Sequence, residues 1–417
     1  MMNDSKITEI AKKIQNAGGN LYLVGGAVRD ELLGLKIHDE DYSVTGISFE
    51  EFKKLFPEAN IRGKAFSVFD IDGKEFAIAR KERKVGKGHK EFNIETDKSI
   101  TIEEDLARRD ITINAIAKNV LTGEIVDPYN GRNDIKNKTI RAVTEQFKED
   151  PLRVYRVARF ASKYQFNVEK NTIKMMNSLK NELSTISAER VYTEFSKALL
   201  TEKPSIFFNI LRQSEVLDIH FRCIYNLIGA EQPIKYHPEG DAYNHTMIVL
   251  DKVSKATKNF DDERKLEIRL GALVHDIGKG ETLKEEYPHH YLHELRGIDI
   301  VRKLGHDLKL PNRLIKCGKT ACREHMRGGI FNNMKPSKKV EFIERVDKSI
   351  LGLDGLQIIV NADNKDAQNF EKIGKMCLEE INGKYINKKY GLREGIEFGR
   401  RLHEERVQWM KKYEDKL

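Results

Sequence analysis

Cysteine is scarce in this sequence: there are four in 417 residues, and none stands in a Cys-x-x-Cys arrangement. This excludes a disulfide framework or a zinc ribbon as the basis of the fold. No apolar run approaches the roughly 18 residues that a transmembrane helix needs, and the mean hydropathy is −0.57. The N-terminal segment is charged and lacks the apolar stretch of a signal peptide. We therefore expect a cytoplasmic protein without a membrane segment.

Charge, by contrast, is abundant. Lys and Arg total 73 against 65 Asp and Glu, which gives a net charge of +8 and an isoelectric point near 9.0. Hydrophobic residues make up 39% of the chain, enough for several cores, and the length predicts two to four domains at about 100–200 residues each. The basic excess suits a polyanionic partner, but many ordinary enzymes share it. Motifs must therefore decide the function.

Strand and helix signals are mixed in the first 140 or so residues. Residues 21–26, LYLVGG, are an apolar run typical of a buried strand. An Asp72-Gly73 pair between two alternating runs predicts a hairpin. Capping boxes predict that helices begin after Ser48 and after Thr101. The N-terminal region should therefore combine a small sheet with helices.

From about residue 150 the periodicity is almost wholly helical, and a loop-like stretch at 229–244 interrupts it. We place a boundary near residue 235. The expected fold class is α+β, with a head at 1–140 built on a small mixed sheet, a helical neck and body at 141–235, and a helical tail at 236–417.

The most informative stretch is LVGGAVRDELLGLKIHDEDYSV at 23–44. It predicts a strand, a Gly25-Gly26 turn whose backbone can approach an anion, a short helix, and a second strand carrying Asp39 and Asp41. Residues two apart on a strand share a face, so both carboxylates can bind one hard cation such as Mg²⁺. A lone Asp-x-Asp is most often a pair of solvated acids. Its fixed distance from the Gly-Gly turn favours metal-dependent phosphoryl chemistry instead.

Two arginine-rich segments suit the same site. Residues 105–114, DLARRDITIN, offer Arg108, Arg109 and Asp110, and residues 149–160 place arginines three apart along a helix. These arginines are Arg153, Arg156 and Arg159. Because apolar residues flank them, we interpret the stripe as part of a site for phosphate or base contacts rather than as a solvated face.

Five motifs follow one another in roughly the first 235 residues: GG-x-VRD, D-x-D, RRDITINAI, DPYNGRNDI and EDPLRVYRVARFA. Together they resemble the bacterial tRNA nucleotidyltransferase (CCA-adding enzyme) and poly(A) polymerase family. The resemblance implies that Asp39 and Asp41 hold catalytic Mg²⁺. It further implies that Gly26, Arg29 and Arg109 bind the nucleoside triphosphate. The implied base-reading pocket consists of Asp150, Arg153, Arg156 and Arg159.

Such a pocket makes physical sense. Cytosine and adenine both present an amine donor beside a ring-nitrogen acceptor, which an Asp acceptor and an Arg donor complement. Uracil and guanine present the reverse pattern and would leave buried polar groups unpaired. A basic loop at 79–92, with Gly86 and Gly88 as hinges, resembles a family loop that moves when the pocket switches from CTP to ATP. Glu75 is a further acidic candidate beside the metal site.

Seven of the twelve histidines fall between residues 237 and 306. His275 and Asp276 are adjacent in an apolar helical run, where an unpaired charge costs several kcal/mol unless it is metal-bound or paired. Further histidines and acids lie before and after this pair, including His245, His325 and Asp363. Imidazole and carboxylate donors together suit Mn²⁺, Co²⁺ or Ni²⁺.

The order of these residues resembles the HD-domain phosphohydrolases over about 240–345. By position, the resemblance implies four metal ligands: His245, His275, Asp276 and Asp363. Lys279 would lie near a phosphate, and His293 is a further ligand or an acid-base group. Relatives with this domain are associated with metal-dependent phosphatase and 2′,3′-cyclic phosphodiesterase activities, which would suit RNA end repair.

The leading hypothesis is an enzyme that adds C, C and A to tRNA 3′ ends from CTP and ATP without a nucleic-acid template, with a second, HD-type hydrolase site. The expected partners are tRNA and the two nucleotides, and the chain is a monomer or a homodimer. Within the family, poly(A) polymerase and CC- or A-only addition remain open. An HD phosphohydrolase with a non-catalytic RNA-binding head, and a purely RNA-binding protein, are the alternatives of other classes.

Overall fold

The computed structural model describes residues 4–37, 39–62, 68–84, 92–95, 97–235, 237–364 and 369–415. They form two compact units, Met1–Val191 with Ile206–Val216, and Tyr192–Ser205 with Leu217–Leu417. The first unit is α+β and the second is helical, so the expected fold class is confirmed. None of the described helices combines the length and apolarity needed to cross a bilayer.

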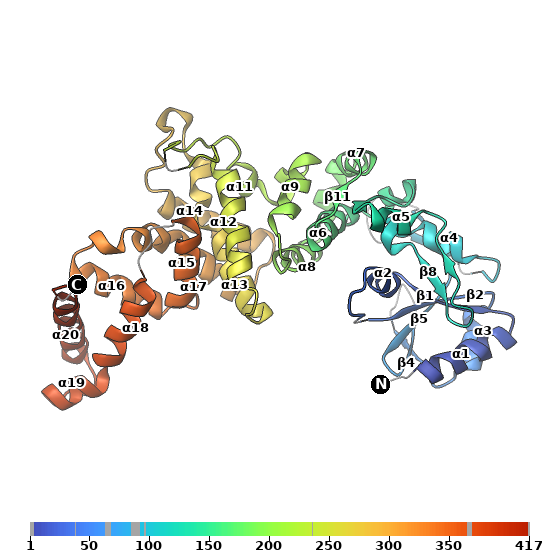
Figure 1. The fold of residues 1–417 in the computed structure, drawn as a ribbon, viewed down its shortest axis with the longest axis horizontal. Helices are drawn as coiled ribbons and strands as arrows, with labels where there is room; N and C mark the ends of the chain where they lie inside the picture. The colour runs from blue at the N-terminus through green and yellow to red at the C-terminus, as the bar shows by residue number, and fades with distance from the viewer. Residues whose placement is uncertain are drawn as a thin grey trace. The chain divides into compact units, whose positions relative to one another are not determined.

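A seven-stranded mixed sheet forms the base of the first unit (Figure 1). Its strand order is β3-β4-β5-β2-β1-β8-β9, and β2 and β5 are its one parallel pair among the described strands. The strands are β1 (Asn20–Val24), β2 (Asp41–Thr45), β3 (Asn60–Arg62), β4 (Val68–Ile71), β5 (Lys74–Ile78), β8 (Ala117–Asn119) and β9 (Ile125–Val126).

One face of this sheet is covered by α1 (Asp4–Asn16) and α3 (Phe49–Leu55). Their apolar side chains join those of alternate strand residues in one core, including Ile10, Phe52, Tyr42 and Phe76. The rings of Tyr42 and Phe76 stack 5.0 Å apart. Because strand side chains alternate, Asp41 and Ser43 of β2 lie on the opposite face.

Local signals decide several element boundaries. Ser48 and Thr101 each make both hydrogen bonds of a capping box, at the starts of α3 and α4 (Ile102–Ala107). β4 and β5 form the predicted hairpin, with Asp72 and Gly73 at positive φ in the turn. These predictions are confirmed.

The second predicted strand differs in one respect. β2 begins at Asp41, so Asp39 precedes the strand rather than lying on it, and the expectation that both acids share the strand is wrong. The reason is that β1 ends at Val24, the pairing partner of Asp41, where the chain turns away at Gly25. The remaining strands, β6 (Lys81–Lys84) and β7 (Phe92–Glu95), pair with each other. The hinges predicted at Gly86 and Gly88 lie outside the described residues.

The rest of the first unit is mainly helical. It also contains one short pair of parallel strands, β10 (Thr139–Ile140) and β11 (Asn167–Val168). The helix that carries the predicted arginines is α6, Arg153–Tyr164, and it is amphipathic as its pattern indicated. The other helices are α2 (Gly26–Leu32), α5 (Gly131–Lys136), α7 (Lys170–Ser178), α8 (Ala188–Leu199), which continues into the second unit, and α9 (Ser205–Gln213).

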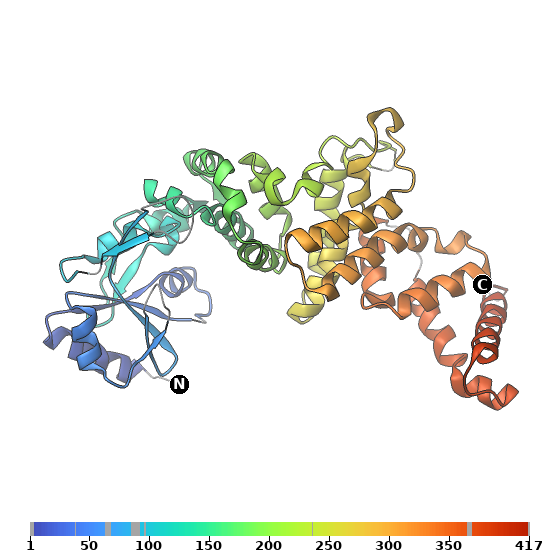
Figure 2. The same ribbon diagram turned by 180° about the vertical axis from the view of Figure 1, so that it is seen from behind.

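In the second unit, α12 to α17 pack around a shared core (Figures 1 and 2). A non-helical stretch separates α11 from α12, as the sequence predicted for 229–244. The helices are α10 (Leu217–His220), α11 (Arg222–Tyr225), α12 (Ala242–Ala256), α13 (Asp262–Val274), α14 (His293–Asp307), α15 (Asn312–Gly329), α16 (Pro336–Asp347) and α17 (Gly352–Asp363), followed by α18 (Phe370–Glu380), α19 (Gly383–Tyr390) and α20 (Ile396–Glu414).

Candidate active sites

The first site begins at the turn between β1 and α2. Gly25 has a φ of 70°, which L-residues rarely adopt, and a Cβ there would meet Nη1 of Arg109 at 2.7 Å. The Gly-Gly turn therefore lets the Arg109 guanidinium lie directly against the backbone that opens α2. Arg29, the next predicted residue, is 5% exposed on the same short helix.

Asp41 lies at the edge of this turn, opposite Val24. Its surroundings raise the pKa of its carboxyl group: partial burial contributes most, the charge of Arg109 opposes the rise, and the charge of Asp39 adds to it. A carboxylate whose ionisation is opposed by burial and by a neighbouring acid in this way is stabilised by a bound cation. This donor set fits a magnesium ion.

A row of acids continues across the sheet from Asp41. Glu75 of β5 is its register partner, and Asp70 of β4 is the partner of Glu75. Asp70 is held by Arg62 at 3.2 Å, whereas Glu75 makes no ion pair with any described residue. Glu75 therefore lies beside Asp41 on the same face of the sheet, where the sequence placed it as an acidic neighbour.

Polar side chains connect α2 to α6 through the residues after RRD. Arg29 donates to the Oδ1 atoms of Asp30, at 2.9 Å, and Asn114. Asn114 donates to Asp110 at 3.0 Å, and Arg156 donates to the other oxygen of Asp110 at 2.8 Å. Burial alone would raise the pKa of Asp110, but Arg156 and Asn114 hold it well below its usual value. The network therefore fixes two of the predicted arginines to one buried carboxylate.

Arg109 has an unused donor. Its Nη1 donates to the Asn114 carbonyl at 3.4 Å and its Nη2 lies 3.6 Å from Asp105, but its buried Nε–H makes no hydrogen bond in the part of the chain that is described. Burial also lowers the pKa of this guanidinium, against the pull of Asp105. Leaving a buried donor unpaired costs about 1–3 kcal/mol. An anionic ligand at the turn would remove that cost.

The predicted base-reading pair, Asp150 and Arg153, lies at the start of α6. Asp150 accepts the backbone N–H of Leu152 at 3.0 Å and a hydrogen bond from Arg190 at 3.3 Å. Arg153 is 8% exposed and donates to the carbonyls of Gln146, at 2.7 Å, and Arg108, at 2.6 Å. Both side chains therefore tie α6 to its neighbours, including the RRD segment.

Aromatic rings hold the remaining arginine of the stripe. The Arg159 guanidinium lies 4.0 Å from the centre of the Phe160 ring, and that of Arg29 lies 4.9 Å from the centre of the Tyr164 ring. Tyr164 also donates to Asp30 at 3.1 Å. The sequence pattern assigned no role to Asn114, which lies within the RRDITINAI motif, or to Tyr164, which lies three residues after the EDPLRVYRVARFA motif.

The second site lies inside the second unit. His245 comes from α12, His275 from the end of α13, and Asp276 and Lys279 from the turn that follows. His293 opens α14, His325 lies on α15, and Asp363 ends α17. His275, His325 and Asp276 are at most 2% exposed. Six separate elements thus place donors around one buried centre.

Two neighbouring donor sets lie there. Ligand atoms of His245, His275 and Asp363 lie within 4.8 Å of one another, and so do those of Asp276, His293 and His325. His245 Nε2 is 2.9 Å from Asp363 and 3.8 Å from Asp276. Three of the four ligands predicted from the sequence therefore form the first set. The fourth, Asp276, belongs to the second set with the predicted His293 and with His325, for which the sequence predicted no role.

Within the second set, Asp276 contacts both histidines. One of its oxygens lies 3.1 Å from His293 Nε2 and 3.3 Å from His325 Nε2, and the other lies 2.6 Å from Lys279 Nζ. Burial opposes its charge, but Lys279 and His275 keep the pKa of Asp276 well below the usual range. Lys279 also donates to Gln232 at 2.6 Å.

Backbone carbonyls orient the imidazoles. Nδ1 lies 2.7 Å from the Ala272 oxygen in His275, 2.8 Å from the His290 oxygen in His293, and 3.0 Å from the Ala321 oxygen in His325. His245 uses Glu239 in the same way, at 2.5 Å. An Nδ1–H that faces an acceptor leaves the Nε2 lone pair directed at the centre.

This centre fits a transition-metal ion. His275 Nε2 and Asp276 Oδ1 are buried and make no hydrogen bond with any described residue. Buried, unpaired donor atoms of this kind are what a metal ion satisfies.

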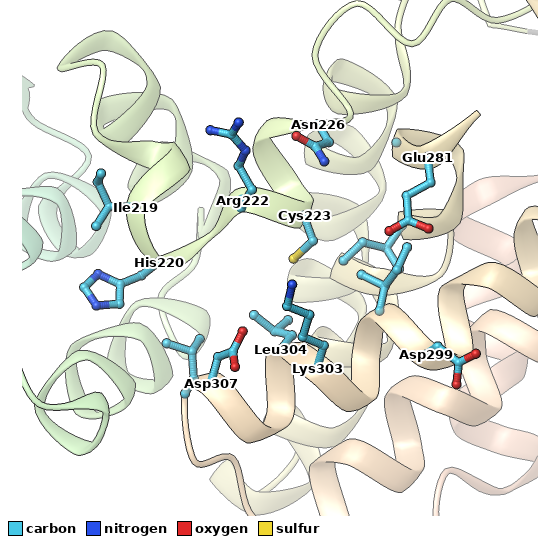
Figure 3. A pocket seen from close by; sticks show the side chains of 14 residues that line it. Ile219, His220, Arg222, Cys223, Asn226, Glu281, Asp299, Lys303, Leu304 and Asp307 are labelled. Carbon is cyan, nitrogen blue, oxygen red and sulfur yellow. The ribbon is translucent and has the colours of Figure 1, made fainter. Parts of the chain in front are cut away.

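A separate cavity of about 470 Å³ lies beside the turn that carries Asp276 (Figure 3). It is lined by Ile277 and Gly280 of that turn and by residues of α10, α11 and α14. The Cys223 thiol points into it toward Lys303. Burial raises the pKa of this thiol to about 12, so it is not a nucleophile. None of the predicted site residues lines this cavity.

Known proteins share this order of domains. A family model described as the poly A polymerase head domain matches residues 21–141, a model of a probable RNA and SrmB-binding site of polymerase A matches 165–227, and an HD-domain model matches 242–350. The multifunctional CCA protein of Mannheimia succiniciproducens is 39% identical over 360 residues, which cover 84% of this chain and 85% of the relative. The chain belongs to the multifunctional CCA protein family.

Solved structures agree at the level of the fold. A CCA-adding enzyme in complex with ATP superposes with a TM-score of 0.66 at 19% identity, over 98% of this chain and 90% of that chain. The Thermotoga maritima CCA-adding enzyme complexed with tRNA gives the same TM-score and identity, over 96% and 90%. The family expected from the sequence is therefore confirmed, together with the presence of an HD domain. Nucleotidyltransferase and HD domains of these kinds use divalent metal ions.

Proposed function

We propose that this protein adds C, C and A to the 3′ end of tRNA from CTP and ATP, and that its HD site hydrolyses phosphate esters at RNA ends. The observation that carries the first activity is the β1–α2 turn, where Asp41, Arg29 and an Arg109 with an unused buried donor surround two glycines. Relatives named for CCA addition support it.

In this proposal Asp39 and Asp41 hold Mg²⁺, with Glu75 beside them. The bound metal would supply a Lewis acid that polarises the α-phosphate. The tRNA 3′-hydroxyl forms the new P–O bond, and the bond to pyrophosphate breaks. Arg109 and Arg29, fixed through Asn114 and the Gly25-Gly26 turn, bind and orient the triphosphate.

We further propose that Asp150, Arg153, Arg156 and Arg159 admit cytosine and adenine. The contact between Arg156 and Asp110 supports this assignment, because it ties the Arg156 guanidinium to the segment that also carries Arg109. The carbonyl contacts of Arg153 give its guanidinium a fixed orientation, which selectivity by hydrogen bonding requires.

For the HD site we propose that four side chains hold Ni²⁺, Mn²⁺ or Co²⁺: His245, His275, Asp276 and Asp363. We propose His293 and His325, which lie next to Asp276, as further ligands of the ion. The donor set of imidazoles and carboxylates supports a transition metal. We propose that Lys279, which contacts both Asp276 and Gln232, holds a substrate phosphate. Phosphatase and 2′,3′-cyclic phosphodiesterase reactions are the proposed chemistry.

The proposed division of labour follows the sequence boundaries: nucleotide addition at 1–140, base selection and RNA binding at 141–235, and hydrolysis at 236–417. We propose that the protein works in the cytoplasm as a monomer or a homodimer.

The test is purified protein incubated with tRNA transcripts that end before CCA, at CC, or at an unrelated 3′ end. CTP and ATP are supplied separately and together with Mg²⁺, and products are read at single-nucleotide resolution. Growth by CCA that then stops, on tRNA alone, is the expected result. Long A tracts from ATP on any RNA would instead identify a poly(A) polymerase. Absence of any addition would leave the HD reaction as the activity.

The Gly25 turn gives a specific prediction. Gly25→Ala is expected to lower kcat/KM for CTP addition by about tenfold or more, since its Cβ would displace the Arg109 guanidinium. Gly34→Ala is the matched control, because Gly34 also has a positive φ, of 67°, but a Cβ there meets nothing within 4 Å. Steady-state kinetics and thermal melts of both variants separate backbone strain from the loss of Arg109. Equal kinetic losses in the two variants would contradict the assigned role.

A further inference from the structure

The outer face of α15 carries a stripe of cations. Lys316, Lys319, Arg323 and Arg327 lie three to four residues apart, which places them on one side of the helix. The opposite side is buried and includes His325 and Cys322. The stripe is therefore a different surface from the one that faces the metal centre.

This stripe lines a groove rather than a convex face. A cavity of about 340 Å³ lies between α15 and the end of α16, where Arg345 and Lys348 add two more cations. A second cavity, of about 550 Å³, shares Arg323 and Arg345 with the first and continues past Arg327 to the start of α14. Six cationic side chains thus follow one continuous groove, which we call the α15–α16 groove.

Few acids balance this charge. Glu324 is 1% exposed, and its carboxylate is taken up by Arg345, at 2.7 Å, and Arg327, at 3.5 Å. Glu294 is the other acid lining the groove. Lys316, Lys319, Arg323 and Lys348 make no ion pair with any residue that the structure describes. Four cations therefore face the groove without a counter-charge.

The groove has an apolar end. Leu292, Leu295 and Met326 line its second cavity and are 61%, 51% and 46% exposed. Arginines held in place by a buried carboxylate present fixed forks of donors to phosphate oxygens, while the lysines supply mobile charge. Exposed leucine and methionine beside them offer contacts to ribose and base faces.

We propose that the α15–α16 groove binds the sugar-phosphate backbone of RNA, in addition to the contacts at the nucleotide site. The proposal rests on the proposed function in one respect, since it takes tRNA as the natural RNA. The groove is concave, carries uncompensated charge and contains paired arginines, and these features suit an RNA backbone. A membrane-binding surface would instead be a flat or convex cationic face.

The test is the full-length variant Lys316→Gln/Lys319→Gln/Lys348→Gln, with fluorescently labelled tRNA and anisotropy read at several salt concentrations without nucleotides. We expect a Kd at least about tenfold higher, and a slope of log K against log salt smaller by roughly 2, at about 0.7–0.9 per lost phosphate contact. The matched control, Lys255→Gln/Lys372→Gln/Lys412→Gln, removes the same charge from exposed lysines on α12, α18 and α20 and should change both quantities much less.

Further measurements separate the possible outcomes. Hydrolysis of bis-p-nitrophenyl phosphate should be equal in the wild-type protein and both variants, which shows an intact second unit. An unchanged Kd and slope in the groove variant would overturn the proposal. Binding of the groove variant to anionic phosphatidylserine vesicles is measured as well. A variant that lost vesicle binding but kept tRNA binding would also overturn the proposal, because the groove would then bind a membrane surface. Because binding is read without nucleotide addition, a wild-type protein that binds tRNA through the groove but adds no CCA would overturn the proposed function alone.

Discussion

Asp41→Asn is expected to lower kcat for nucleotide addition by at least about three orders of magnitude, which corresponds to about 4 kcal/mol of lost transition-state stabilisation. The carboxylate is one of two that would hold Mg²⁺ beside the Gly-Gly turn, and an amide binds the ion far more weakly. Single-turnover incorporation of CTP on a tRNA transcript measures the effect.

The same variant should keep its fold. In the folded protein the pKa of Asp41 is raised, so its charge opposes folding at neutral pH when no metal is bound. The neutral amide removes that penalty, and the melting temperature in chelator should be equal or higher. Glu40→Gln is the matched control, because Glu40 accepts from Tyr42 at 2.8 Å and Lys74 at 2.7 Å, away from the site. A comparable loss of addition in Glu40→Gln would contradict the assignment.

Asp276→Asn is expected to abolish tight binding of Mn²⁺ or Ni²⁺ to the HD site and to lower hydrolysis of bis-p-nitrophenyl phosphate at least about a hundredfold. Its two oxygens lie next to His275, His293, His325 and Lys279, so its carboxylate contacts four polar side chains of the centre. Metal content after dialysis and hydrolysis rates measure the two effects, and CCA addition should be unchanged.

Asp299→Asn is the control for this second variant. Asp299 lies on α14, in an exposed ion pair with Arg302 at 2.6 Å, and its neutralisation should leave metal content and hydrolysis intact. If Asp276→Asn retained bound metal and full hydrolysis, the buried cluster would be a structural ion-pair network instead.

Much of the head was predictable because its signals are local. The capping boxes at Ser48 and Thr101 and the Asp72-Gly73 hairpin each depend on residues that are close in sequence, and all three form as expected. The position of Asp39 was not predictable in the same way. The start of β2 depends on where its partner β1 leaves the sheet, and that is a tertiary property.

The side chains that sequence reasoning missed share a cause. Asn114 matters because it bridges Arg29 and Asp110, and Glu239 because it meets His245. His325 was visible as a histidine, but its role follows from the packing of α15 against α13 and α14. Periodicity shows which face of a helix is buried, and it does not show which buried residues of other helices meet there.

The two faces of α15 have a consequence for how this chain can vary. One face carries His325 of the proposed metal centre, and the other carries the cations of the groove. The direction of both sets of side chains therefore depends on the same helical rotation per residue. A single inserted or deleted residue would rotate everything after it by about 100°. Point substitutions can therefore alter either face alone, while insertions and deletions within α15 would misplace both, and natural variation in length should be confined to the loops on either side of it.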